Sequence, residues 1–154
     1  MKNLFYLFFI SMVPLIELRG AIPVGAALGV PWLECFAVSV IGNVVPIPFI
    51  LLFIRKILFF MKTKERLAPI ANWVLDRAAK RTDSVTKYAT WGLFLFVGVP
   101  LPGTGAWTGA LIAALLNMRF RYAMLSVFGG VVVAGFIMSG ISYGFLGFLD
   151  FLLF

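Results

Sequence analysis

The segment Pro14-Leu15-Ile16-Glu17-Leu18-Arg19-Gly20-Ala21-Ile22-Pro23 places a carboxylate, a guanidinium and two prolines inside the first apolar stretch of the chain. An ionisable side chain at the centre of a bilayer costs about 3 kcal/mol or more, so it usually faces a partner, a cavity or a pathway. Proline interrupts the hydrogen bonding of a helix. We therefore expect this segment to break a membrane helix and to mark the functional site.

The composition of the whole chain is that of an integral membrane protein. Of its 154 residues, 62% are hydrophobic and 12% are charged, whereas a soluble domain has about 25% charged residues. The single cysteine, Cys35, excludes an internal disulfide, and we interpret it as a small apolar filler. The chain has no histidine, so the usual His-based bases and zinc sites are missing, and we expect no metal and no cofactor.

Two charge-free stretches are long enough to cross a membrane. Residues 35–54 form a run of twenty and residues 122–149 a run of twenty-eight, and a span needs about 20 apolar residues. Asn43, Pro46 and Pro48 interrupt the first run, and the second contains a Gly140-x-x-x-Gly144 motif that would allow close helix contact. The start of the chain could also pass for a signal peptide, but it has no small-residue cleavage site, so we interpret it as a retained membrane segment.

Two further apolar stretches are interrupted in the middle. Residues 4–16 and 20–30 flank Glu17-Leu18-Arg19, and residues 91–99 and 106–116 flank a segment rich in proline and glycine at 100–105. Each arm has about 9 to 13 residues, or about 14–20 Å of helix, which reaches only the middle of an apolar core about 30 Å thick.

The interrupted stretches fit two arrangements. In the first, residues 3–30 and 90–117 fold back as re-entrant helical hairpins. In the second, each stretch continues as one broken span. Backbone without regular hydrogen bonds is tolerated at this depth only where it is buried in protein or lines a cavity. In both arrangements, the polar tips therefore face the inside of the protein.

A basic segment separates the two halves. Residues 55–87 contain nine Lys or Arg against three acidic residues, and the positive-inside rule places such a segment in the cytoplasm. Within it, Pro69 can open a basic amphipathic helix with Trp73 and Val74 on its apolar face, which would lie on the anionic inner leaflet; a solvated linker is the alternative. We expect a multi-pass protein of the cytoplasmic membrane with residues 55–88 in the cytoplasm. The net charge of +7 is thus a topology signal, and we expect no nucleic-acid binding.

An offset of 87 residues aligns the two halves of the chain. Ser39-Val40-Ile41-Gly42-Asn43-Val44-Val45 then lies over Ser126-Val127-Phe128-Gly129-Gly130-Val131-Val132, and Ala26-Ala27-Leu28 lies over Ala113-Ala114-Leu115. We predict one all-α membrane domain, 1–154. Its parts are a first repeat at 1–60 (hairpin 3–30, span 32–57), a linker at 61–89, and a second repeat at 90–154 (hairpin 90–117, span 120–149).

The charges at the ends of these elements favour an inverted repeat. If both interrupted stretches are hairpins, Arg119 and Arg121 fall inside the cell, Glu34 and Asp150 fall outside, and only Lys2 is misplaced. If both are broken spans, the repeat is parallel and the two arginines fall outside. Inverted repeats with discontinuous helices meeting at the midplane are the plan of many secondary transporters.

The first tip combines a titratable group with an anion-binding group. In an unwound tip, Glu17 and Arg19 can face one cavity, where burial disfavours the carboxylate and the guanidinium favours it, so that Glu17 could take up and release a proton. Arg19 offers a planar fork of donors for a phosphate or carboxylate, and Gly20 with the following helix, which contains Pro23, adds free N–H groups. The alternative is a structural Glu-Arg pair that closes the tip.

The second tip is uncharged. Pro100 and Pro102 lack N–H groups, and Gly103 and Gly105 permit tight turns. Hydroxyls and an indole N–H come from Thr104, Thr108 and Trp107, which we interpret as a pocket wall facing the first tip; a structural break with Trp107 as packing is the alternative. Asn43 lies in the first span, where we expect an interhelical hydrogen bond more than a substrate contact.

The two tip motifs resemble a known family. Glu17-Leu18-Arg19-Gly20-Ala21-Ile22-Pro23 and Pro100-Leu101-Pro102-Gly103-Thr104-Gly105-Ala106-Trp107-Thr108-Gly109-Ala110 are similar to motifs of the bacterial and archaeal "putative small multi-drug export protein" family, over nearly the whole chain. That family resembles the DedA membrane proteins, which implies two re-entrant hairpins facing each other and either proton-dependent transport or movement of lipid phosphates between leaflets. DedA proteins pair an acidic residue in the first hairpin with an arginine in the second. Here Glu17 matches the acidic residue, but Arg19 lies in the same hairpin.

Two hypotheses from different classes follow. The first is a transporter that exports or flips a small anionic or amphipathic molecule, coupled to protons, at the Glu17/Arg19 tip. We expect it to be a homodimer, since two full spans in one chain do not enclose both tips. The second is a non-transporting membrane scaffold or assembly protein. An enzyme is not expected, because paired catalytic carboxylates, histidine and a nucleophile motif are missing. A channel would need several chains.

Overall fold

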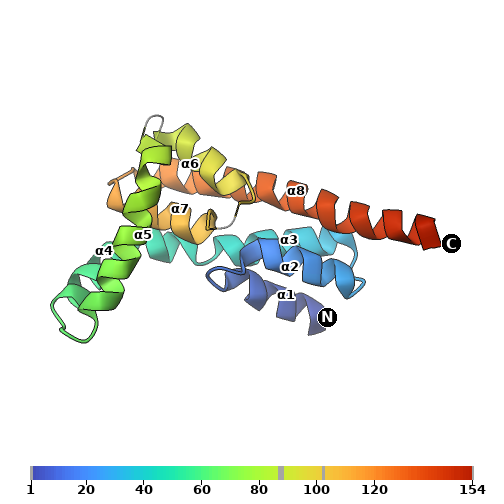
Figure 1. Cartoon of the computed structure of the whole chain (residues 1–154), viewed down its shortest axis with the longest axis horizontal. Coiled ribbons are helices and arrows are strands. Elements are labelled where there is room, and N and C mark those ends of the chain that lie inside the picture. The colour runs from blue at the N-terminus through green and yellow to red at the C-terminus, as the bar shows by residue number, and fades with distance from the viewer. Residues whose placement is uncertain (1, 87–88, 102, 154) are drawn as a thin grey trace.

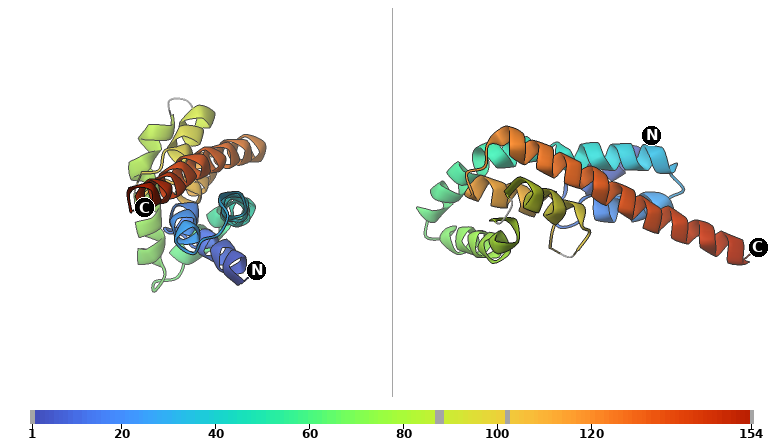
Figure 2. Two further views of the ribbon diagram at one scale, coloured as in Figure 1. Left: turned by 90° about the vertical axis from the view of Figure 1, so that its right-hand side faces the viewer. Right: turned by 90° about the horizontal axis from the view of Figure 1, so that it is seen from above.

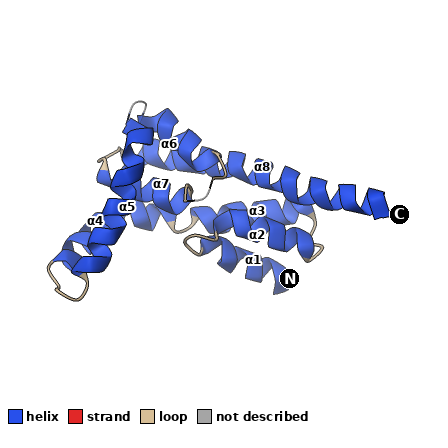
Figure 3. Ribbon diagram, in the orientation of Figure 1, coloured by secondary structure: helices blue, strands red, loops and turns tan. Residues whose placement is uncertain are grey.

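The computed structural model describes residues 2–86, 89–101 and 103–153, and over these residues every regular element is a helix (Figures 1 and 3). The side chains at 78, 81–86 and 145–153 lie outside the description. The helices are α1 (Lys2–Met12), α2 (Glu17–Ala27), α3 (Trp32–Val44), α4 (Ile47–Lys62), α5 (Ala68–Thr86), α6 (Ala89–Gly98), α7 (Ala106–Leu115) and α8 (Phe120–Leu153). The predicted all-α class is therefore confirmed.

The first interrupted stretch folds into two helices, α1 and α2, that run back along each other (Figure 1). Helix α1 ends at Met12, as expected where a proline two residues later disfavours helical backbone at the residue before it. Helix α2 ends in a Schellman motif, in which the N–H groups of Gly29 and Val30 donate to the carbonyls of Ala26 and Gly25. Gly29 has a positive φ of 69° there, which glycine adopts without steric cost.

The second interrupted stretch has the same layout. Helix α6 ends at Gly98, an irregular segment follows up to Gly105, and α7 turns back. Helix α7 also ends in a Schellman motif, with Asn117 at a φ of 55° and N–H groups of Asn117 and Met118 donating to Ala114 and Ala113. The predicted helical arms on both sides of 100–105 are thus present.

Within the described part of the chain, two helices are long and apolar enough to cross a membrane. They are Trp32–Lys62, which comprises α3 and α4, and Phe120–Gly144 within α8. The first bends at Val45 and Pro46, because Pro46 has no N–H to donate to the carbonyl four residues earlier. It continues to Lys62, past the predicted end at residue 57. Helices α3 and α8 pack against each other, with the rings of Phe36 and Phe136 4.6 Å apart.

The core is built from small residues that let the helices approach closely. Ala21 on α2, with Ala110 and Ala113 on α7, is completely buried. Gly130 on α8 lies against α6, where an added Cβ would come within 2.7 Å of the Cβ of Val97. The turn of α1–α2 and the segment between α6 and α7 come together near the middle of the molecule, and the outer part of α8 extends beyond the other helices (Figures 1 and 2).

The predicted basic helix is present as α5, with Pro69 in its first turn. It lies across one end of the bundle, against α4, α6 and α7 (Figure 1). Among its described side chains Ala71 is fully buried, whereas Ile70 and the predicted apolar residue Trp73 are more than half exposed. Helix α5 therefore buries part of its apolar surface against the other helices and exposes the rest.

Candidate functional site

The first tip is placed differently from the sequence prediction. The turn occupies residues 13–16, and Glu17 to Gly20 form the first turn of α2 instead of an unwound segment. The N–H of Glu17 donates to Val13 and that of Gly20 to Ile16, so Gly20 offers no free donor. The chain reverses earlier than expected, at Pro14 and Leu15, and both Leu15 and Glu17 hold positive φ angles of 81° and 51°, which are strained for side chains with a Cβ.

The Glu17 carboxylate binds the start of α7. Its Oε1 accepts a hydrogen bond from the N–H of Trp107 at 3.0 Å, and its Oε2 accepts one from the N–H of Ala106 at 3.3 Å. The side chain is only 5% exposed. The first N–H groups of a helix have no partner within the helix and carry partial positive charge. Glu17 supplies the acceptors for α7 from a segment 89 residues away.

Arg19 binds the end of α6 and the irregular segment after it. Its Nη2 donates to the carbonyls of Val97 and Val99, both at 3.2 Å, and its Nη1 donates to Leu101 at 2.8 Å and to Thr104. Cations near a helix C-terminus stabilise its unpaired carbonyls. The fork of donors, which the sequence assigned to a substrate anion, is thus occupied by backbone of the second tip.

Glu17 and Arg19 therefore act on the two ends of one broken helix. Within the described residues they form no ion pair with each other; the carboxylate holds the N-terminus of α7, and the guanidinium holds the C-terminus of α6. Gly105 makes this approach possible, since a Cβ at that position would lie 2.3 Å from Oε2 of Glu17. The sequence predicted that the two tips face each other, and the structure brings them into direct contact.

Polar side chains of the second tip also bond within the protein. The Thr104 hydroxyl lies 2.9 Å from the carbonyls of Val99 and Leu101 and closes the irregular segment. The indole N–H of Trp107 donates to the carbonyl of Met12 at 3.1 Å, which ties α7 to the end of α1. Trp107 thus joins the two tips, and Thr104 closes the second tip on itself. The sequence assigned both residues to a pocket wall.

Asn43 is a buried polar group beside the Glu17 carboxylate. It is 1% exposed, and its Oδ1 has no hydrogen-bond partner among the described residues. With Glu17, Arg19 and Val97 it lines a space too narrow for a water molecule. An unpaired buried carbonyl oxygen costs about 1–3 kcal/mol, so this atom is a ready acceptor for any donor that forms next to it.

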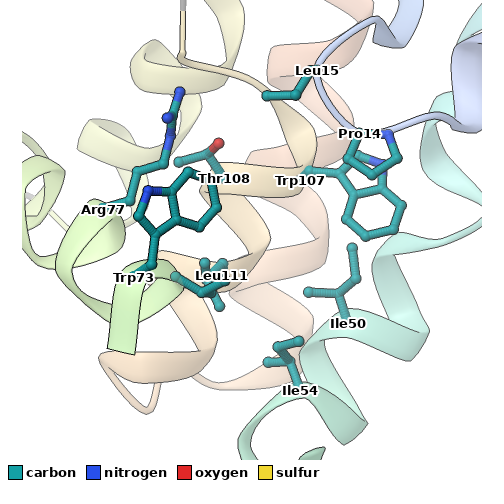
Figure 4. Close-up of a pocket in the computed structure, with 10 residues that line it drawn as sticks. Pro14, Leu15, Ile50, Ile54, Trp73, Arg77, Trp107, Thr108 and Leu111 are labelled. Carbon is teal, nitrogen blue, oxygen red and sulfur yellow. The ribbon is translucent and has the colours of Figure 1, made fainter. Parts of the chain in front are cut away.

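A cavity of about 290 Å³ opens between the tips. Its lining residues are Leu15, Glu17, Arg19, Pro100, Leu101, Gly103, Thr104, Thr108 and Met138. Leu15 and Thr108 also line a second, apolar cavity of about 300 Å³ (Figure 4). The polar residues of both tips therefore surround one space that borders an apolar one.

The predicted site residues fall into three groups. Those that line the space between the tips or bond across it are Glu17, Arg19, Asn43, Pro100, Gly103, Thr104, Gly105, Trp107 and Thr108. Gly20 packs against Ile16, and Pro23 lies farther along α2, so neither belongs to the lining of these two cavities. Pro102 lies outside the described residues.

The sequence did not point to Leu15 or Met138. Leu15 is apolar, and nothing in its type signals the positive φ that places it at the boundary of both cavities. Met138 lies among many apolar residues of α8, and only the packing of that helix brings it to the tips.

Comparison with known proteins identifies the family. A family model described as "Putative small multi-drug export protein" matches residues 17–137. This range includes Glu17, Arg19, the segment between α6 and α7, all of α3 and α4, and the first half of α8. No curated protein and no solved structure matched the chain. Together with the two long apolar helices, the family match indicates a membrane protein. The chain belongs to the small multi-drug export protein family.

Proposed function

We propose that the protein is a proton-coupled transporter that moves a small amphipathic molecule across the membrane through the space between the two tips. The observation that carries this proposal is the buried Glu17 carboxylate, which holds the start of α7 beside a cavity of about 290 Å³. A structural break alone needs no titratable group at that place. The family description supports export of small molecules.

Protonation of Glu17 would weaken the contact between the tips. An ionised carboxylate accepts at both oxygens, whereas the protonated acid carries an O–H donor on one of them. One of the two N–H groups of α7 would then lose its acceptor. The segment between α6 and α7 would be held by Arg19 and by the one remaining bond to Glu17. Protonation and deprotonation of Glu17 would therefore switch the contact between the tips between two states of the transport cycle.

We propose that the two helix pairs are re-entrant hairpins related by an inverted repeat in the cytoplasmic membrane, with residues 55–88 in the cytoplasm. The helix bounds support this arrangement, because α2 and α7 begin at residues 17 and 106, and α3 and α8 begin at 32 and 120. Both second arms also end in the same motif, at Gly29 and Asn117. Short helices whose ends meet near the midplane are typical of transporter sites.

The test is transport in sealed vesicles that contain the purified protein. The probes are 8-anilinonaphthalene-1-sulfonate, an amphipathic anion, and ethidium, an amphipathic cation, each followed with and without a pH gradient. We expect gradient-dependent movement of at least one probe by the wild type and by Glu34→Gln, an exposed control on α3. We expect none by Glu17→Gln. Gradient-dependent movement by Glu17→Gln at the wild-type rate would contradict the mechanism.

A structural role is the second candidate, and one observation favours it. Both terminal nitrogens of Arg19 and both carboxylate oxygens of Glu17 are already bonded to backbone of the second tip and its flanking helices. In a scaffold or assembly protein, Glu17→Gln would change only stability. Folded wild-type protein that moves neither probe, nor any small amphipathic molecule offered, would favour this second candidate.

We also propose that the chain works as a homodimer through the outer part of α8. Phe136 and Ile141 are exposed there, and a Cβ added at Gly140 or Gly144 would meet no described atom within 4 Å. Glycines four residues apart allow two helices to approach closely. Native mass measurements in lipid should give a dimer for the wild type and a monomer for Gly140→Leu. A monomeric wild type would contradict this proposal.

A further inference from the structure

The apolar cavity of about 300 Å³ lies beside the space between the tips and is formed by parts of the chain that are far apart in sequence (Figure 4). The turn between α1 and α2 contributes to it, as do α4, α5 and α7. Its lining residues are Pro14, Leu15, Ile50, Ile54, Trp73, Val74, Arg77, Trp107, Thr108 and Leu111. A volume of this size is at the lower end of the range of about 300–1,000 Å³ for small-molecule sites.

Two indole rings face this cavity from opposite sides. Trp73 comes from α5 and Trp107 from α7, with Ile50 and Ile54 beside the second ring (Figure 4). Aromatic faces give large, rigid contact areas for flat or chain-like apolar groups. The ring of Trp73 faces this cavity, and the residue is 58% exposed. Part of its apolar surface therefore makes no contact with the rest of the protein.

Among the described residues, one charged side chain lines this cavity. The guanidinium of Arg77 stacks on the ring of Trp73, with its central carbon 5.4 Å from the ring centre. Thr108 adds a hydroxyl at the boundary with the polar cavity. In that polar cavity the charges of Glu17 and Arg19 offset each other, so Arg77 leaves the combined space with one positive charge in excess. A guanidinium recognises carboxylate and phosphate groups through a planar set of donors.

We propose that this cavity binds an amphipathic anion, with the apolar body between Trp73 and Trp107 and the anionic head at Arg77. This proposal names the substrate class of the proposed transporter. It rests on the proposed function only where it takes the bound anion to be the molecule that is transported. Binding itself is independent of protons and of Glu17. The anion has two sources, a membrane lipid with one chain in the cavity or a free amphiphile, and the chemistry at the site is the same for both.

Quenching of the two cavity tryptophans measures this binding. In a Trp32→Phe/Trp91→Phe background only Trp73 and Trp107 remain, and bromine quenches indole fluorescence on contact. The protein is placed in nanodiscs of zwitterionic lipid, without a pH gradient. It is then titrated with three amphiphiles of one chain length: a brominated fatty acid, a brominated alcohol and a brominated alkyl trimethylammonium salt.

We expect saturable quenching by the fatty acid at lower concentration than by the alcohol or the ammonium salt. Arg77→Gln should weaken the binding of the fatty acid about tenfold or more, the range for a hydrogen bond to a charged group, and leave the alcohol unchanged. Lys80→Gln is the matched control, since it removes one exposed positive charge from the same helix and should bind the fatty acid as before. Ile54→Phe, which fills part of the cavity without adding a tryptophan, should weaken the binding of both the acid and the alcohol.

Equal binding of the acid by Arg77→Gln and its parent, or equal affinities for the three amphiphiles, would overturn the proposal. Either result would leave the proton-coupling test at Glu17 untouched, because the titration uses no proton gradient. Adding an unbrominated anionic phospholipid to the nanodisc separates the two sources. Loss of the Arg77-dependent quenching assigns the site to lipid, and its persistence assigns it to a free amphiphile.

Discussion

Replacement of Gly105 by alanine tests the contact between the two tips. Gly105 precedes α7 with φ 150° and ψ −178°, a backbone region that is almost exclusive to glycine and costs other residues about 1–3 kcal/mol. The added Cβ would also lie 2.3 Å from Oε2 and 2.8 Å from Oε1 of Glu17. The carboxylate is the end of a flexible side chain, so it can move away, but only by giving up its bonds to α7.

The expected loss of stability has two parts. The backbone contributes about 1–3 kcal/mol. Loss of the charge-assisted contact between Glu17 and the N–H groups of Ala106 and Trp107 adds about 1.5–3 kcal/mol. We therefore expect Gly105→Ala to lower the free energy of unfolding by about 2.5–6 kcal/mol. Gly29→Ala is the control, because Gly29 has a φ of +69° but no described atom within 4 Å of an added Cβ, so only strain of about 1–2 kcal/mol is expected there.

A double-mutant cycle separates the two parts. Equilibrium unfolding in mixed micelles, followed by far-UV circular dichroism, gives the free energies of the wild type, Glu17→Ala, Gly105→Ala and the double variant. In the Glu17→Ala background the carboxylate is absent, so Gly105→Ala should cost only its backbone strain. The cycle should then give a coupling energy of about 1.5–3 kcal/mol. Additive effects would refute the contact, and so would equal costs for Gly105→Ala and Gly29→Ala.

Three further outcomes follow from the same packing. Arg19→Lys should lower the free energy of unfolding by about 1.5–3 kcal/mol, since one ammonium cannot reach four carbonyls. Arg55→Lys, whose exposed side chain donates to Oδ1 of Asn117, should change it far less. Similar losses for both variants would be contrary evidence. Gly130→Ala should lower the free energy of unfolding by more than about 1 kcal/mol, because the added Cβ overpacks the contact between α6 and α8. A Cβ added at Gly98 would lie 3.6 Å from its nearest neighbour, so Gly98→Ala should leave the free energy of unfolding unchanged or raise it in the same assay. Trp107→Phe removes one donor to a backbone carbonyl and should cost about 0.5–1.5 kcal/mol, measured by the same titration.

The sequence was sufficient to predict that both interrupted stretches break in the middle, but it placed the first break at residues 17–19, and the structure has it at 13–16. Proline and glycine mark the ends of α1 and α6, and the long apolar runs mark α3 and α8, because each of these signals acts locally on the backbone. The facing of the two tips was also predictable, since irregular backbone in an apolar environment must find partners inside the protein.

The identity of those partners was not predictable from the sequence. Arg19 and Glu17 have the chemistry to bind an anion or a proton, and the same chemistry satisfies the unpaired carbonyls of α6 and N–H groups of α7. Only the three-dimensional packing decides between these uses. The positive φ of Leu15 and Glu17 had no signal either, because neither is a residue type that prefers that conformation.

The central claim is that the two tips meet near the middle of the bilayer. Trp107, whose indole bonds to the end of α1, reports the depth of that contact in a chain with Trp32→Phe, Trp73→Phe and Trp91→Phe. In vesicles made with lipids brominated at different positions along the acyl chain, we predict the strongest quenching of Trp107 by bromine near the chain ends, at the midplane. The strongest quenching by bromine next to the headgroups would contradict the claim.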